Sequence, residues 1–195
     1  MRVYVETNFL LEVVLEQEEV THAERLLELA GSAAVELVVP AVCALEARQT
    51  IHRRDREQRD LLDRVDRELV QLARSQSVAR AASEMRGVFV AATGSIRKRE
   101  DELLRRLSLV GRWAALDGSA ITAAMSSEGL LLPDAMVLAS VVQDAGSRVC
   151  EAVFATKNSK DFGQPAVRRK LREVGCELVF SFADALAKVQ GRATP

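Results

Sequence analysis

The sequence predicts an α/β fold in which a central, mostly parallel sheet of four to five strands is flanked by helices in three layers. Short apolar runs of strand length alternate with longer segments of helical periodicity. Gly or Pro separates many of these segments, and no internal repeat or low-complexity linker interrupts them. The 195 residues, of which 48% are hydrophobic, suffice for one domain with its own core.

The N-terminal part is expected to form a strand, two helices and a second strand. Residues 3–5 are an apolar run typical of a buried strand, and Thr7 or Asn8 can cap the helix that follows. Residues 21–30 predict the second helix and residues 35–39 the second strand. The first helix has a polar side that is expected to face water, with Glu12, Glu16 and Glu19.

A long helical insert is expected between residues 50 and 115. From Ala41 to about Ser77 the chain has no Gly or Pro and its leucines recur at helical spacing, and a helical pattern resumes from Val78 to Gly111. Dense mixed charge on such helices usually marks a solvated face. We therefore expect an antiparallel hairpin of long helices within a single domain that spans residues 1–190.

The C-terminal part is expected to complete the sheet. Helices are predicted over residues 118–127, 133–146, 165–174 and 183–189. Strands are predicted over residues 150–155 and 178–180, and residues 191–195 should be a frayed tail. Strands that alternate with helices imply parallel pairing, with strand C-termini and helix N-termini on one edge of the sheet.

Charge and cysteine content bound the class of protein. The net charge of −1 offers no global attraction to nucleic acid, so such binding would need local basic patches. Cys43, Cys150 and Cys176 have neither disulfide nor zinc spacing and are expected to be buried thiols of a reducing compartment. No signal peptide is evident and no uncharged run could span a bilayer, so a cytoplasmic location is expected.

Four carboxylates fall where an open α/β sheet places its active crevice. Glu6 closes the first strand, Glu46 follows the second, Asp134 opens a helix after Pro133, and Asp161 follows the strand that ends at Ala155. Each has an ordinary structural explanation as a cap, a turn former or a surface residue. Convergent acidic groups repel one another, and a hard divalent cation relieves that repulsion. The four together therefore predict a metal site.

Other common catalytic arrangements are not indicated. His22 and His52 lie on charged helices without a ligand partner one turn away, so both are expected to be exposed. No Gly-rich phosphate loop and no Cys-His or Ser-His arrangement occurs.

Taken together, these segments resemble the PIN domain family of metal-dependent nucleases. The likeness covers roughly residues 1–50 and 115–182, and the long insert is similar to that of bacterial PIN-like proteins of unassigned function. The residues that match the family pattern are Glu6, Asn8, Glu46, Asp134, Thr156, Asn158, Asp161 and Phe162. Glu6 stands where the family usually has Asp, which moves the carboxylate about 1.5 Å, one C–C bond, further out.

The resemblance implies a divalent-metal-dependent nuclease, most simply an endoribonuclease, with Mg²⁺ or Mn²⁺ as cofactor. Glu6, Glu46, Asp134 and Asp161 would bind the metal, partly through waters, and Asn158 would orient a ligand. Asn8, Lys157 and Lys160 would contact the substrate phosphate. Thr7 and Thr156 would either hydrogen-bond that phosphate or hold a metal ligand in place by a hydrogen bond. Further basic residues lie on two helices, at Arg48, Arg53, Arg54 and Arg56 and at Arg168, Arg169, Lys170 and Arg172.

Two other functions stay open on the sequence alone. A catalytically weak or inactive PIN-like module could bind nucleic acid or protein through its helical insert. A toxin of a toxin-antitoxin pair could be held by a small inhibitory partner protein. RNA is the expected substrate and DNA the alternative, no membrane is expected, and a homodimer is left open.

Overall fold

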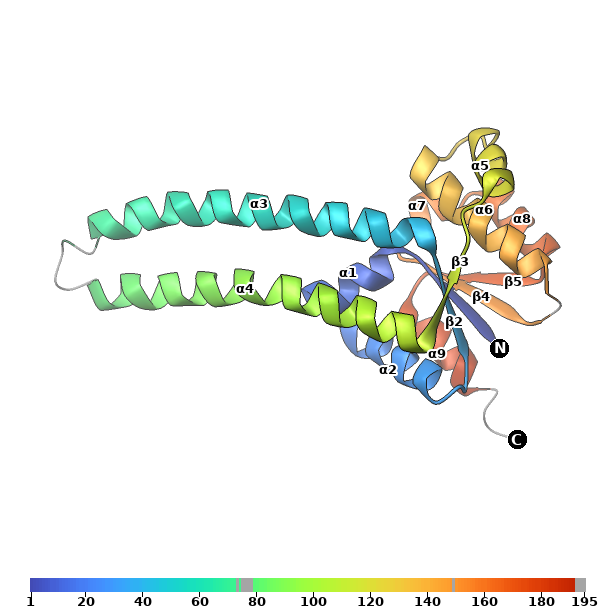
Figure 1. Cartoon of the computed structure of the whole chain (residues 1–195), viewed down its shortest axis with the longest axis horizontal. Helices are drawn as coiled ribbons and strands as arrows, with labels where there is room; N and C mark the ends of the chain where they lie inside the picture. Colours follow the sequence, from blue (N-terminus) through green and yellow to red (C-terminus); the bar gives the residue numbers. More distant parts are fainter. Residues whose placement is uncertain (73, 75–78, 149, 192–195) are drawn as a thin grey trace. The chain divides into compact units, whose positions relative to one another are not determined.

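The computed structural model describes residues 1–72, 74, 79–148 and 150–191 (Figure 1). The chain divides into two compact units, one formed by Met1–Ala47 with Leu103–Pro195 and the other by Arg48–Glu102. The first unit contains the sheet and every predicted site residue. The second contains most of two long helices. The tail expected at 191–195 lies, from residue 192 on, outside the described residues.

The sheet of the first unit has five parallel strands in the order β3-β2-β1-β4-β5. The strands are β1 (Arg2–Val5), β2 (Glu36–Pro40), β3 (Gly111–Ala114), β4 (Ala152–Ala155) and β5 (Cys176–Val179). Every residue of the central strands β1 and β4 is buried, as expected for a sheet covered on both faces. The predicted α/β class and the parallel sheet of four to five strands are thereby confirmed.

Strand β3 lies inside the stretch expected to be helical from residue 50 to residue 115. Its sequence, Gly-Arg-Trp-Ala, contains no apolar run and is only four residues long. It forms because it lies against β2, with Leu37 paired to Gly111 and Pro40 to Ala114. Residues 111–114 therefore form an edge strand because they pair with a neighbouring strand, and not because of their own β propensity. The insert therefore ends before residue 111.

Helices cover both faces of the sheet and give the three layers (Figure 1). One face carries α1 (Thr7–Leu15), α2 (Val20–Gly31) and α9 (Phe182–Gln190). The other carries α5 (Gly118–Met125), α6 (Leu132–Gly146) and α8 (Pro165–Glu173), with the single turn α7 (Ser159–Phe162) between β4 and α8. Gly129 and Gly175 have positive φ angles of 82° and 69°, which suits glycine in the turns before α6 and β5.

Two edge-to-face aromatic pairs fix helices close to the sheet. Phe9 of α1 packs on Phe182 of α9 with ring centroids 5.2 Å apart. Phe154 of β4 packs on Phe162 of α7 at 5.1 Å. All four rings are fully buried, and such a pair contributes about 0.5–1.5 kcal/mol beyond burial. The second pair matters for function because it anchors the one-turn helix that carries Asp161.

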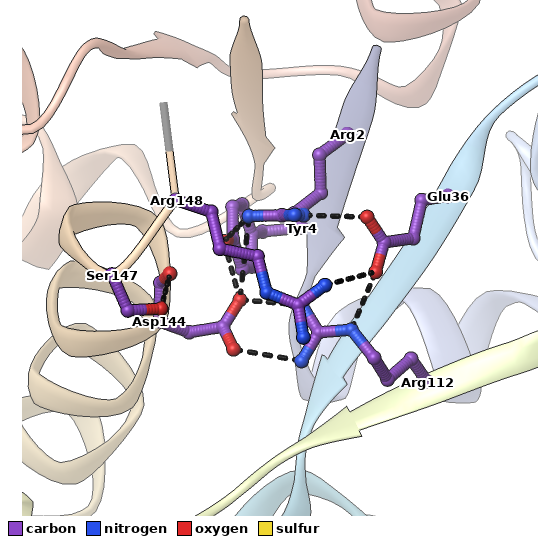
Figure 2. Close-up of polar contacts among 7 residues, drawn as sticks. All are labelled: Arg2, Tyr4, Glu36, Arg112, Asp144, Ser147 and Arg148. Carbon is purple, nitrogen blue, oxygen red and sulfur yellow. Dashed lines mark hydrogen bonds and ion pairs between the residues drawn. The ribbon is translucent and has the colours of Figure 1, made fainter. Parts of the chain in front are cut away.

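An ionic cluster holds the amino edge of the sheet, where β1, β2 and β3 begin (Figure 2). The buried guanidinium of Arg2 donates to Glu36 at 2.8 Å, and Arg112 donates to the same carboxylate at 2.6 Å. Arg112 also makes two bonds to Asp144 near the end of α6, at 2.7 and 2.5 Å, and the Tyr4 hydroxyl donates to Asp144 at 2.6 Å. Because each carboxylate faces arginines, this cluster is charge-compensated and ties three strands to α6.

The second unit consists of the parts of α3 (Ala41–Leu72) and α4 (Ala79–Val110) that lie between Arg48 and Glu102. The two helices run side by side as an antiparallel hairpin, as predicted for the insert (Figure 1). The buried carboxylate of Asp55 on α3 accepts from Arg97 of α4 at 2.7 Å and also pairs with Arg59. Ile51, Leu69 and Ile96 are its buried aliphatic residues among those described.

Four predictions of burial or exposure are wrong. One is Glu19, which is half-buried rather than facing water and whose Oε2 accepts from the backbone N–H of Phe182 at 2.5 Å. Cys43 and Cys176 are buried as expected, but Cys150 is exposed because it precedes β4 rather than lying in it. His22 is half-buried rather than exposed. Glu12 is buried instead of facing water, because it lies on the same helix face as the core residue Phe9. Among the described residues, no helix is both long and apolar enough to cross a bilayer.

Candidate functional site

The strand order places a crevice at the carboxyl ends of β1 and β4. From β1 the chain builds β2 and β3 on one side and later β4 and β5 on the other. Where the strand order reverses in this way, the loops that follow the two central strands diverge and leave room for a ligand. Glu6 directly follows β1, and Thr156 directly follows β4. This edge is opposite to the one held by the arginine cluster.

Glu6 is a buried carboxylate with both oxygens engaged. It is the N-cap of α1, where Oε2 accepts from the backbone N–H of Asn8 at 2.8 Å. Its Oε1 accepts from the Thr156 hydroxyl at 3.0 Å. Burial raises the pKa of Glu6 to about 7, although these hydrogen bonds act in the opposite direction. The longer side chain at this position is thus held in one orientation by Asn8 of α1 and by Thr156, which directly follows β4.

A chain of hydrogen bonds leads from Glu6 across the crevice to α6. The Thr156 hydroxyl that donates to Glu6 also accepts from the backbone N–H of Asn158 at 2.9 Å. The Asn158 side chain donates through Nδ2 to Oδ1 of Asp134 at 3.3 Å. Its Oδ1 accepts from the backbone N–H of Asp161 at 3.2 Å, so that Asn158 caps α7. Thr156 and Asn158 therefore connect the carboxylates of Glu6 and Asp134 with the backbone of Asp161.

Asp134 lies in the first turn of α6 and faces other acidic groups. It is half-buried, and its pKa is raised to about 6, first by burial and then by the negative charges of Asp161 and Glu46. The hydrogen bond from Asn158 opposes that rise. Since both charges act on Asp134, Glu46 and Asp161 lie near it at the same edge.

Glu46 comes from the second turn of α3, six residues after the last residue of β2, Pro40. The Thr7 hydroxyl donates to its Oε2 at 2.6 Å, which connects α1 to α3. Cys43 lies one turn earlier on α3 and is fully buried. Burial raises the pKa of its thiol well above the usual value, and the charges of Glu6 and Glu46 add to the rise. Cys43 is the site neighbour that sequence reasoning missed, although its spacing of three from Glu46 on a helix could have indicated it.

The donor chemistry of this cluster fits a hard divalent cation. Within the described residues, Glu6, Glu46, Asp134 and Asp161 have no Lys, Arg or His ion-pair partner. The pKa values of Glu6 and Asp134 are both raised, as expected for carboxylates whose negative charge has no positive partner. No three acidic, His or Cys side chains of the described ranges are close enough to enclose an ion by themselves. Mg²⁺ commonly binds through one or two carboxylates with waters completing its shell, which suits this wider spacing.

The lysines expected to contact substrate differ in their surroundings. Lys157 donates to Glu12 at 2.5 Å and to Glu18 at 2.9 Å, so its charge is already compensated. Lys160 is exposed and, in the part of the chain that the structure describes, forms no ion pair. Asn8 contributes its backbone N–H to Glu6, and its side chain is half-buried. Of the two, Lys160 is the better-placed cation for an anionic ligand.

Thr7 and Thr156 hold the carboxylates rather than an open position for substrate. Each hydroxyl has its single hydrogen directed to a carboxylate, Glu46 for Thr7 and Glu6 for Thr156. A donor so committed orients a metal ligand and is not free to bind a phosphate. On the neighbouring helix α8, Arg168 donates to the Gly163 carbonyl and stacks on Phe180, while Arg172 is exposed.

Comparison of the chain with protein-family models, with curated proteins and with solved structures finds no match in any of the three. The site must therefore be interpreted from its own geometry.

Proposed function

We propose that this protein is a divalent-metal-dependent nuclease of the PIN type that hydrolyses phosphodiester bonds, with RNA as its substrate. The observation that supports this most is the group of four carboxylates at the switch point of a parallel sheet, held by hydrogen bonds but without a cation. Uncompensated carboxylates raise each other's pKa and cost stability unless a positive charge binds. A site so arranged is suited to binding Mg²⁺ or Mn²⁺.

In this mechanism the metal would be held by the four carboxylates of Glu6, Glu46, Asp134 and Asp161. When bound, such an ion lowers the pKa of a coordinated water and polarises a phosphate oxygen. Thr156 and Thr7 keep Glu6 and Glu46 in orientation by donating to them. Asn158 positions Asp134 and the start of α7. Asp134, with a pKa of about 6 in the absence of metal, is largely ionised at neutral pH and is therefore available as a metal ligand.

The substrate contacts in this proposal come from exposed and half-buried cations on α7 and α8. Lys160 lies on α7 next to Asp161, and α8 adds Arg169, Lys170 and Arg172. Phosphate contacts dominate nucleic-acid affinity, so a local basic group compensates for the protein's net charge of −1. We also propose that the protein acts in the cytoplasm, where an exposed free thiol such as that of Cys150 would stay reduced.

The test is cleavage of defined single-stranded RNA and DNA with Mn²⁺, Mg²⁺ or EDTA. Wild type should cleave RNA only with metal, and Asp134→Asn should lose at least about 100-fold in rate because it removes a metal-binding charge. Asp184→Asn is the matched control, since Asp184 occupies the first turn of α9 in the same way that Asp134 occupies that of α6. It should keep the wild-type rate.

Two results contradict the proposal. Equal cleavage by wild type and Asp134→Asn would identify the activity as a contaminant. Failure of wild type to bind Mn²⁺ at millimolar concentration in calorimetry would assign the chain to a non-catalytic binding module instead.

A further inference from the structure

The second unit, residues 48–102, is positively charged, although the chain as a whole is not. It contains 13 Lys and Arg residues against 10 Asp and Glu residues, a net charge of +3, so the first unit has −4. The excess is confined to residues 48–59 and 95–99, which together contain eight basic residues and only two acidic ones, Asp55 and Glu57. The rest of the unit contains five basic and eight acidic residues. A local excess of this size produces a positive potential that attracts polyanions.

The two basic segments lie side by side in the hairpin (Figure 1). Asp55 on α3 accepts from Nε and Nη2 of Arg97 on α4, at 3.2 and 2.7 Å, and also pairs with Arg59. The carboxylate is buried, whereas the side chains of Arg59 and Arg97 are 53% and 58% exposed. One buried acid therefore fixes two exposed guanidinium groups and leaves one of their two positive charges uncompensated. Each guanidinium also keeps N–H groups that no other described side chain accepts.

Two further arginines extend this pair along α3. Arg48, Arg56 and Arg59 lie within an arc of about 80° of the helix and span about 16 Å of its length. Arg48 and Arg56 are exposed and, within the part of the chain that the structure describes, have no carboxylate partner. We call Arg48, Arg56, Arg59 and Arg97 the basic face of the hairpin.

The surroundings of the basic face favour a water-soluble polyanion over a membrane. Acidic residues limit it at both sides, since Asp63 follows Arg59 by one turn of α3 and residues 100–102 follow on α4. The large apolar residues within 48–59 and 95–99 are Ile51 and Ile96, and both are buried. A helix that binds a membrane surface needs an exposed apolar face beside its basic one. The segments that form the basic face offer none.

We propose that the basic face binds the phosphodiester backbone of single-stranded RNA. The inference rests on the proposed nuclease function, which selects a phosphodiester chain among the linear polyanions that arginines bind. Guanidinium groups bind phosphate oxygens through paired N–H donors. Because Asp55 already orients Arg59 and Arg97, these two side chains lose less conformational freedom on binding than unrestrained arginines would. The second unit thereby supplies affinity for RNA that the first unit, with its net charge of −4, does not supply by overall charge.

The test measures the binding of a fluorescent thirty-nucleotide oligouridylate by anisotropy, in EDTA so that metal-dependent cleavage does not occur. A variant with Arg48→Gln and Arg56→Gln should bind about tenfold more weakly at about 0.1 M salt. The slope of log affinity against log salt should fall by about 1.4, since each phosphate contact with a single strand contributes about 0.7. Arg48→Lys with Arg56→Lys keeps both charges and should retain most of that slope.

The matched control is Arg64→Gln with Arg67→Gln. It removes two exposed arginines from the same helix, in the stretch beyond Asp63 where acidic residues balance the basic ones. The control should change the affinity less than twofold. Circular dichroism should show wild-type helix content in all these variants, because the replaced side chains are exposed.

The basic face is overturned as an RNA surface if the Arg48→Gln, Arg56→Gln variant binds RNA as wild type does, or if the control variant loses as much affinity. Tighter binding of wild type to a thirty-residue polyglutamate would identify an acidic protein as the partner instead, and tighter binding to phosphatidylserine vesicles a membrane. Failure of the nuclease proposal is measured separately, by cleavage with Mn²⁺. Cleavage together with unaltered binding by the variant rejects the basic face alone. Selective loss of RNA binding without any cleavage by wild type rejects the nuclease alone.

Discussion

At the scale of single residues, Glu6 carries the largest electrostatic cost of the site. Its side chain is 4% exposed, and burial raises its pKa from 4.5 to about 7. In the protonated form Glu6 can donate to Thr156, whose oxygen is able to accept. In the ionised form it is a buried charge without a cation. The residue therefore favours a proton at low pH and favours a metal ion at high pH.

This predicts how stability depends on pH without metal. Between about pH 4.5 and 7 the folded state keeps a proton on Glu6 that the unfolded chain has released, so the free energy of unfolding falls as pH rises. Glu6→Gln mimics the protonated acid and should be more stable than wild type at pH 8 by roughly 3 kcal/mol, with no difference near pH 4. Urea denaturation in EDTA at both pH values measures this. A Gln variant less stable than wild type at pH 8 would contradict it.

The hydroxyl of Thr156 gives a second prediction. Thr156→Val keeps the shape but removes the donor to Glu6 and the acceptor for the Asn158 N–H. Loss of a group that orients a metal ligand typically weakens metal binding by about 10- to 100-fold. Mn²⁺ titration by calorimetry should show that loss, and Thr156→Ser should restore most of the affinity. Wild-type affinity in the Val variant would mean that Glu6 does not need this bond.

Residue chemistry also shows which parts of the site a sequence can predict. Glu6, Glu46, Asp134 and Asp161 lie at one edge because each follows a strand or begins a helix, and parallel topology brings such positions together. The roles of Thr7 and Thr156 depend on side-chain rotamers, which periodicity does not determine. Lys157 was expected to contact phosphate, but it pairs with Glu12 and Glu18 from a distant segment. Sequence offers no signal for that pairing.

At the scale of elements, the two edges of the sheet have opposite electrostatics. The amino edge contains Arg2, Arg112 and Arg148 around Glu36 and Asp144 (Figure 2). Although burial acts to raise it, hydrogen bonds from Arg112 and Tyr4 hold the pKa of Asp144 below its usual value. The carboxyl edge has acids without such partners. We therefore infer that the amino edge stabilises the fold and propose that the carboxyl edge carries the function.

Removal of Asp144 should therefore destabilise the fold. Asp144→Ala leaves both terminal nitrogens of Arg112 and the Tyr4 hydroxyl without their acceptor, although Arg112 keeps its bond to Glu36, and this should cost about 3 kcal/mol in unfolding free energy. Glu173→Ala, which removes an exposed pair with Arg169, should cost less than about 1 kcal/mol. Denaturation at pH 7 compares the two. Equal losses would contradict a structural role for the amino edge.

The lowered pKa of Asp144 also determines how the stability of the fold changes in acid. The pKa of Asp144 is lower in the folded chain than in the unfolded chain. Its carboxylate therefore stabilises the fold fully above the unfolded pKa, near pH 4. This contribution is lost as the pH falls through the folded pKa. The stability difference between wild type and Asp144→Ala should therefore shrink below about pH 4. An unchanged difference at pH 3 would show that packing, not charge, determines the effect.

Elements differ in how well the sequence predicts them. The helices of the first unit begin and end within a few residues of expectation because Gly, Pro and capping residues mark them, as Asp117 marks α5 and Ser181 marks α9. The last strand was expected at 178–180 but spans Cys176–Val179, because its pairing with Ala152–Ala155 sets its register. Strand β3 was missed for a similar reason, since only its pairing with β2 defines it.

At the scale of the whole molecule, the helical hairpin is inserted between two strands that pair directly. β2 and β3 are adjacent in the sheet, although the long helices separate them in sequence. The sheet and its buried aromatic pairs belong to the first unit alone. The hairpin has its own interhelical link, between Asp55 and Arg97. Each unit therefore has interactions that do not depend on the far end of the hairpin.

This predicts that the far part of the hairpin can be removed. Replacement of residues 60–93 by a four-residue Gly/Ser turn keeps Asp55 and Arg97 and stays within the usual length of a helix-helix connection. The shortened chain should fold, with circular dichroism reduced only by the lost helix, and should cleave RNA at a rate within about threefold of wild type. An unfolded product would show that the hairpin is part of the folding unit.

The pairing of β1 with β4 has a consequence for the protein during its synthesis. The carboxylates of the site come from positions 6 to 161, and β1 cannot complete the centre of the sheet until Ala152–Ala155 has been made. At typical elongation rates that interval is on the order of ten to thirty seconds. Under the function proposed above, Glu6 would be synthesised well before the other residues of the site. The strand order would then keep the site incomplete until residue 161 has been made.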